Sequence, residues 1–267
     1  MSNTFEVNFL GTNGSCAYNG GNRQKHGSNS ICIAARVGEE TLVFDAGSGI
    51  CGLQEMPKVQ VKRVHLFFSH YHMDHINGLL FCSELFDPAY TFHIYGSGNV
   101  KCIIHEFLSP PLHPVGLDEL KAKIEFHEIE SGETLSLPNS IQVSTFGLIH
   151  PGGSMGYRVN YGGKVLCYCT DAELAEHQND GELLEFTRDA DLLVLDSFFE
   201  DGKVIPGWGH ASPSECAEWA ARSNVKKLAL FHHSFRKSDE ELEQMAAEAK
   251  AIFPNTFLSS DRMCVKV

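Results

Sequence analysis

The chain of 267 residues lacks long hydrophobic runs, CxxC cysteine pairs and a surplus of basic residues. No run reaches the roughly 18 consecutive apolar residues of a membrane-spanning helix, and the opening MSNTFEVNFLG has no basic or apolar signal region. The 9 cysteines form no CxxC motif and mostly lie in apolar runs. These absences predict a cytoplasmic protein with reduced thiols and no membrane partner.

Basic side chains are also scarce. Lysine and arginine total 21 against 34 aspartates and glutamates, which gives a formal net charge of −13. Because long nucleic acids are bound largely by basic side chains that neutralise phosphates, the charge argues against a long nucleic acid as partner. The sequence leaves open whether the chain forms a homodimer.

The hydrophobic pattern predicts one domain over residues 1–267, with two sheets covered by helices. Helices are expected near Asp74, over 99–107, and after the capping boxes that begin at Ser212 and Ser238. Loops 12–30 and 108–116 are long enough to be either functional walls or plain surface loops. Strand-like runs occupy residues 5–11, 31–37, 41–47, 64–69, 91–96, 124–129, 141–147, 156–161, 164–170, 191–198, 227–233 and 262–267.

Histidine is the unusual presence, with 14 residues, and the stretch SHYHMDHINGL contains three of them. In an extended segment His70 and His72 point the same way. If a helix begins at Asp74, that carboxylate and His75 are displaced to a neighbouring position. The segment would then supply two ligands to each of two metal ions, and each ion would need further ligands, because zinc generally takes at least three from the protein.

Further candidates follow strand-like runs downstream. His150, Asp171 and His232 each stand where a strand ends, and His210 lies in the turn GWGHAS before a capped helix. Any one of them alone is readily explained as structural, and Asp171 could cap a helix. Together with the 70–75 cluster they indicate a metal site. Cys167 and Cys169, although close to Asp171, are interpreted as strand core.

The motif HxHxDH, formed by residues 70–75, resembles the signature of the metallo-β-lactamase superfamily, and the likeness spans nearly the whole chain. It implies an α/β fold: the αββα sandwich of two mixed sheets flanked by helices. The resemblance also implies a ligand set: His70, His72 and His150 for the first ion, Asp74, His75 and His232 for the second, and Asp171 as the bridge. His233 adjoins His232, and the end of the strand favours His232.

Further motifs are similar to ribonuclease Z and to small cyclic-phosphate phosphodiesterases: GTNGS, DAGSG, GGSMGYRV, GHAS and HHS. This likeness implies that His210 is catalytic and pairs with Asp196; Asp74 completes the expected catalytic set. Asp45 is expected to support the ligand loop from behind. Only 20 residues separate His150 from Asp171, whereas ribonuclease Z typically carries a long tRNA-gripping arm there. With the acidic charge, this favours a small phosphodiester substrate of the cyclic nucleotide or cyclic phosphate type.

The expected mechanism is attack on phosphorus by a hydroxide that bridges two divalent ions. His210 would donate a proton to the leaving oxygen, and Asp196 would fix its tautomer. Zinc is the expected metal, with manganese or iron as alternatives. The same site could instead hydrolyse a carboxylic ester, thioester or lactone. The third hypothesis is a non-catalytic ligand sensor or accessory protein.

Overall fold

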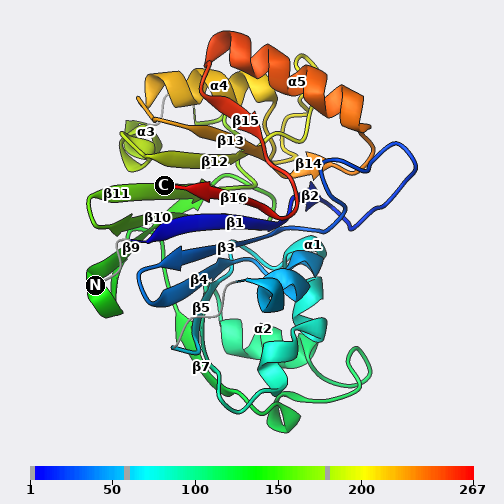
Figure 1. Cartoon of the computed structure of the whole chain (residues 1–267), viewed down its shortest axis with the longest axis vertical. Helices are drawn as coiled ribbons and strands as arrows, with labels where there is room; N and C mark the ends of the chain where they lie inside the picture. Colours follow the sequence, from blue (N-terminus) through cyan, green and yellow to red (C-terminus); the bar gives the residue numbers. More distant parts are fainter. Residues whose placement is uncertain (1–3, 57–60, 178–180) are drawn as a thin grey trace.

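Two seven-stranded sheets form the centre of the computed structural model, which describes residues 4–56, 61–177 and 181–267 (Figure 1). The first sheet has the order β16-β1-β3-β4-β5-β6-β7. Its strands are Met263–Lys266, Phe5–Gly11, Cys32–Val37, Glu40–Phe44, Arg63–Phe67, Thr91–Gly96 and Lys123–Glu128, in that order.

The second sheet has the order β15-β13-β12-β11-β10-β9-β8. Its strands are Thr256–Leu258, Leu228–Phe231, Leu192–Asp196, Lys164–Cys169, Ser154–Tyr161, Ile141–Leu148 and Thr134–Leu137. Two short strands, β2 (Asn13–Gly14) and β14 (His233–Ser234), pair in parallel beside the main sheets.

Helices cover the outer face of each sheet (Figure 1). The first sheet is covered by α1 (Met73–Ile76), α2 (Val100–Phe107) and short 3-10 helices at Ser48–Glu55, Asn77–Phe81 and Ser83–Phe86. The second is covered by α3 (Gly181–Thr187), α4 (Pro213–Arg222) and α5 (Asp239–Ile252). Further 3-10 turns lie at Leu117–Glu119 and Pro138–Ser140. Within the described ranges, none of the helices is long and apolar enough to cross a membrane.

The predicted capping boxes are confirmed. Ser212 accepts a hydrogen bond from the backbone of Glu215 at the start of α4, and Ser238 does the same for Glu241 at the start of α5. Each glutamate carboxylate accepts in return from the amide of the capping serine, so in both helices the amides of the cap and of the third helical residue are satisfied.

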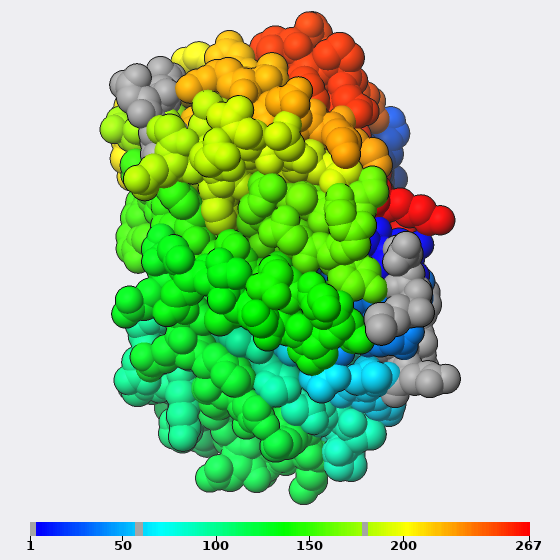
Figure 2. All heavy atoms as spheres, turned by 90° about the vertical axis from the view of Figure 1, so that its left-hand side faces the viewer, coloured from blue at the N-terminus to red at the C-terminus, as the bar shows by residue number. Residues whose placement is uncertain are grey.

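Three apolar layers hold the four-layer arrangement together. Between the sheets, Phe9, Phe44, Tyr157 and Phe231 are buried in one cluster. A second cluster lies between the first sheet and its helices, and a third fills the corresponding space over the second sheet. On the side seen in Figure 2, the middle of the chain, in green, spans much of the surface. The predicted αββα sandwich of two mixed sheets is confirmed.

Strand direction explains where the polar residues gather. The pairs β4–β5, β11–β12 and β12–β13 are parallel, and β9 runs the same way as β11 because both are antiparallel to β10. Within each sheet the carboxyl ends of these strands therefore lie at the same edge. The contact between His72, which follows β5, and His150, which follows β9, shows that the two edges meet along one rim of the sandwich.

Candidate metal centre

Three histidines from two loops form the first group at this rim. His70 and His72 follow β5, and His150 lies in the turn after β9. His70 Nε2 is 2.8 Å from His72 Nδ1, and His150 Nε2 is 3.2 Å from the same His72 atom. The three rings thus converge on one point from two elements that are far apart in sequence, as a shared cation would require.

Asp74, His75 and His232 form the second group. Asp74 and His75 stand in the first turn of α1 and are buried, as is His232 at the end of β13. His232 Nε2 is 3.3 Å from Asp74 Oδ2. The neighbouring His233 turns away, with its Nε2 3.0 Å from the carbonyl of Ser259. Of the two adjacent histidines, only His232 therefore faces the group.

Asp171, which ends the β11 segment, lies between the two groups. Its Oδ1 is 3.3 Å from His232 Nε2 and 3.8 Å from His150 Nε2, and its Oδ2 is 3.4 Å from His75 Nε2. Asp171 is buried, and its φ of 58° is left-handed. A non-glycine residue in that conformation is uncommon and is often found where function outweighs backbone strain.

The atoms that face this space suit metal ions. His75 Nε2 and both ring nitrogens of His232 are buried without a hydrogen-bond partner among the described residues, which is costly unless another group binds them. Burial lowers the pKa of His75, but the charges of Asp171, Asp45 and Asp74 outweigh it and raise that pKa to about 10. The space is therefore strongly negative and accommodates cations.

Asp45 holds part of the cluster in place through hydrogen bonds. This carboxylate follows β4, is fully buried, and accepts hydrogen bonds from the amide and hydroxyl of Ser69, the hydroxyl of Tyr168 and Nδ1 of His75, at 2.7–2.9 Å. The last contact fixes the tautomer and orientation of His75, so that Nε2 faces the cluster. Asp45 thus contacts the 69–75 segment both through the backbone of Ser69 and through the side chain of His75.

His210 and Asp196 form a pair beside the cluster. His210 Nδ1 is 3.0 Å from Asp196 Oδ2, and the imidazole stacks on His232 with ring centroids 4.9 Å apart. Asp196 is fully buried at the end of β12 and also accepts from the backbone amides of Ala172 and Ala211. Burial lowers the pKa of His210, but the hydrogen bond and charge of Asp196 outweigh it, and the pKa is raised overall.

Loop 12–30 contributes to the site through its backbone. The amide of Ser15 donates to Asp74 Oδ2 at 2.7 Å. Gly14 packs so closely on His232 that a Cβ there would lie 2.3 Å from its ring. The buried side chain of Arg23 fixes the loop by donating to the carbonyls of Ser234 and Lys237. Of the two alternatives for this loop, the contacts favour a functional wall.

Sequence reasoning missed Glu173. Its buried carboxylate accepts hydrogen bonds from the amides of Gly207 and Gly209 at 2.8–2.9 Å. The carbonyl of Gly209 in turn accepts from His150 Nδ1 at 2.9 Å. Glu173 therefore anchors the turn that contains His210 and that contacts His150 through the carbonyl of Gly209. An acid two positions after Asp171 was the available signal.

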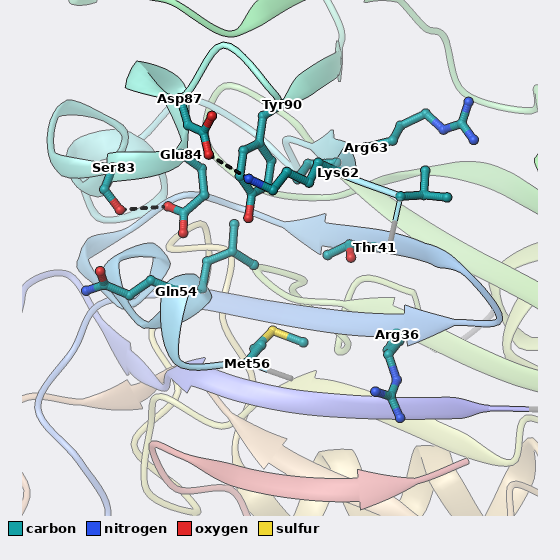
Figure 3. Close-up of a pocket in the computed structure, with 13 residues that line it drawn as sticks. Arg36, Thr41, Gln54, Met56, Lys62, Arg63, Ser83, Glu84, Asp87 and Tyr90 are labelled. Atoms are coloured by element: carbon teal, nitrogen blue, oxygen red, sulfur yellow. Dashed lines mark hydrogen bonds and ion pairs between the residues drawn. The ribbon is translucent and has the colours of Figure 1, made fainter. Parts of the chain in front are cut away.

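Cys167, Cys169 and a cavity beside the first sheet are not part of this group of side chains. Cys167 and Cys169 are buried in β11, as expected of core residues. A cavity of about 410 Å³ opens beside Lys62, Glu84 and Asp87 (Figure 3). Lys62 there is paired with Asp87 at 2.8 Å, and none of the predicted ligands lines the cavity.

The fold and the clustered histidines match a known class. A family model described as the β-lactamase superfamily domain matches residues 40–233, so the chain belongs to this family. Ribonuclease Z of Pyrococcus furiosus is 26% identical over 310 positions that cover 96% of this chain and 94% of that protein. The alignment is longer than the chain, so that relative has residues without a counterpart here.

Solved structures agree on the fold. The metallo-β-lactamase fold protein YhfI from Bacillus subtilis has a TM-score of 0.75 at 17% identity and covers all of both chains. The short form of human tRNase Z has a TM-score of 0.72 at 20% identity, covering 97% of this chain and 98% of that one. With the sequence relatives, these findings make the chain a metal-dependent hydrolase of the phosphodiesterase branch, as predicted.

The prediction about the partner is wrong. The chain aligns over nearly its whole length with enzymes named ribonuclease Z, which conflicts with a small-molecule substrate and with the argument against long nucleic acids. The physical reason is that net charge sums the whole surface, whereas recognition of a phosphodiester depends on the site and its immediate surroundings. A charge of −13 therefore does not exclude RNA.

Proposed function

We propose that this protein hydrolyses phosphodiester bonds in RNA with two divalent ions, of which zinc is the first to test. His70, His72 and His150 would hold one ion, Asp74, His75 and His232 the other, and Asp171 would contact both. Ions bound there would lower the pKa of a water nucleophile and neutralise the charge on the phosphoryl oxygens. Proton transfer to the leaving oxygen would be carried out by side chains of the protein.

The observation that carries the proposal is the hydrogen bond between His210 and Asp196. Because a carboxylate only accepts, the 3.0 Å contact puts a hydrogen on His210 Nδ1 and leaves Nε2 to act on substrate. Protonated at Nε2, His210 can donate to the leaving oxygen of a phosphodiester. Hydrolysis of a carbon ester needs such an acid less, so the pair favours phosphodiester chemistry.

Aromatic side chains next to His210 support a nucleic-acid substrate. Trp208 is 56% exposed, two residues from His210, and its ring lies 6.3 Å from that of Phe199. Unpaired bases commonly stack on exposed aromatic rings of this kind, whatever their sequence. The Glu173 carboxylate holds the backbone on both sides of Trp208, so the ring is presented from a fixed turn.

The test is a comparison of three substrates with the zinc- and manganese-loaded protein: a precursor tRNA transcript, bis(p-nitrophenyl) phosphate and p-nitrophenyl acetate. We expect metal-dependent cleavage of the first two. Turnover of the acetate alone would overturn the phosphodiesterase assignment. Cleavage of bis(p-nitrophenyl) phosphate without any cleavage of the transcript would overturn the RNA substrate and leave the chemistry standing.

A further inference from the structure

A second group of potential metal ligands lies at the free edge of the first sheet. His93 is in the middle of β6, and Glu125 and His127 are on β7, the edge strand. The strands are parallel, with His93 opposite Glu125 and Tyr95 opposite His127. Since side chains along a strand alternate between faces, all three ligand side chains project from the same face of the sheet.

The spacing of the donor atoms matches a metal site. His93 Nδ1 is 3.2 Å from His127 Nε2 and 3.3 Å from Glu125 Oε2. Zinc bonds of 2.0–2.1 Å in a tetrahedron place neighbouring ligand atoms about 3.3–3.4 Å apart. An ion could therefore be bound by the three side chains with little change in their positions.

Stacked rings hold the two imidazoles in place. His93 stacks on His65 with centroids 5.1 Å apart, and His127 stacks on Tyr95 at 4.6 Å. His65 is itself committed, because Nδ1 contacts the hydroxyl of Tyr95 and Nε2 contacts Glu40. His65 therefore supports the site by stacking on His93 and is not a fourth ligand.

The charges are also compatible with a cation. Oε1 of Glu125 pairs with Lys123 at 2.6 Å, while Oε2 is the oxygen that faces His93. The side chains of His93 and Glu125 are 19% and 36% exposed, which lets an ion enter and leaves a fourth position for water.

We propose that His93, Glu125 and His127 form an additional divalent-metal site, the edge site, which takes Zn²⁺ or a similar transition ion. The bound ion would link β7 to β6 and so fasten the edge strand of the sheet, the part most exposed to fraying and to pairing with other chains. The edge site shares no residue with the proposed catalytic centre and does not depend on it.

The test begins with the metal content of protein stripped by chelator and reloaded with zinc. Wild type should bind one equivalent more than His127→Ala or Glu125→Gln, whereas His105→Ala, which removes an exposed histidine on α2, should bind as wild type does. Cleavage of bis(p-nitrophenyl) phosphate should be the same in all four proteins. Because the quantity compared is the difference in zinc content between wild type and variant, the result does not depend on how many ions the catalytic centre binds.

Two more measurements make the outcome decisive. Zinc a hundredfold above the Kd of the edge site should raise the Tm of wild type by about 5–10 °C more than that of His127→Ala. In wild type, zinc should also protect His93 and His127 from modification by diethyl pyrocarbonate, a readout that needs no variant. Equal zinc content in wild type and His127→Ala, or unprotected His93 and His127, would overturn the proposal.

Discussion

Asp45 and Asp196 are matching carboxylates on opposite sheets. Each is fully buried at the end of a parallel strand, β4 or β12, and each accepts a hydrogen bond from Nδ1 of a histidine. The distances are also alike: 2.9 Å from Asp45 to His75 and 3.0 Å from Asp196 to His210. Both therefore leave Nε2 of their histidine as the atom that acts.

The surroundings of the two histidines differ. His75 is fully buried, and its Nε2 lies between Asp74 and Asp171. The side chain of His210 is 12% exposed and lies next to the aromatic rings of Phe198 and Phe199. One arrangement suits a metal ligand and the other suits an acid that meets substrate. The role of each carboxylate–histidine pair thus depends on the surroundings of the histidine Nε2.

The largest effect is expected at Asp171, the carboxylate that both groups of proposed ligands share. Asp171→Ala should lose at least one metal ion and reduce phosphodiester cleavage to background, because the remaining ligands would no longer be linked. Elemental analysis and turnover of bis(p-nitrophenyl) phosphate measure the two effects. His72→Ala should also lose an ion. Asp191→Ala removes another buried carboxylate, at the start of β12, and should keep a full metal complement.

The next effect concerns His210. His210→Ala should keep both ions and lower kcat on an RNA phosphodiester by about 10²–10⁴-fold, the usual contribution of a positioned acid–base group. The loss should be smaller on bis(p-nitrophenyl) phosphate, because nitrophenolate leaves without protonation. If the variant loses a metal ion, or loses as much activity on both substrates, His210 is a ligand or a bystander and the contrast with His75 fails.

Asparagine variants of the two carboxylates are expected to differ in metal affinity and in whether excess metal restores activity. Asp45→Asn puts an amide where Ser69, Tyr168 and His75 all donate, and should weaken metal affinity by about 10–100-fold; excess metal should restore activity. Asp196→Asn should leave metal affinity unchanged and produce a milder form of the His210→Ala defect that excess metal does not repair. Titration of activity with zinc separates these outcomes, and identical curves would show that the two pairs do the same work.

The sequence singled out side chains that the structure brings together at this rim, because candidate ligands of a metal site must be particular residue types. Histidines and aspartates at strand ends have few structural reasons to recur, so His70, Asp171 and His232 could be selected before their neighbours in space were known. The strands between them follow alternating apolar patterns. The short edge strands β8 and β15 were missed because they are only four and three residues long, with little pattern to detect.

Contacts made by the backbone could not be predicted in the same way. The amide of Ser15 donates to Asp74, but every residue except proline carries such an amide. Glu173 resembles a surface acid until the turn that donates to it is in place. The edge site was missed for a related reason, since His93 and His127 become neighbours only through the register of β6 and β7.

The smallest effect is expected from Trp208, and it tests whether the exposed side of the His210 pair faces RNA. Trp208→Ala should raise KM for a precursor tRNA transcript by about tenfold, since stacking of one base contributes about 1–3 kcal/mol. The kcat on the transcript and both constants on bis(p-nitrophenyl) phosphate should be unchanged, because that substrate has no base to stack. Ile252→Ala, which removes an exposed apolar side chain at the end of α5, should have no effect on either substrate. An equal loss on both substrates in Trp208→Ala would mean that the ring supports the turn carrying His210, and the aromatic surface would no longer argue for RNA.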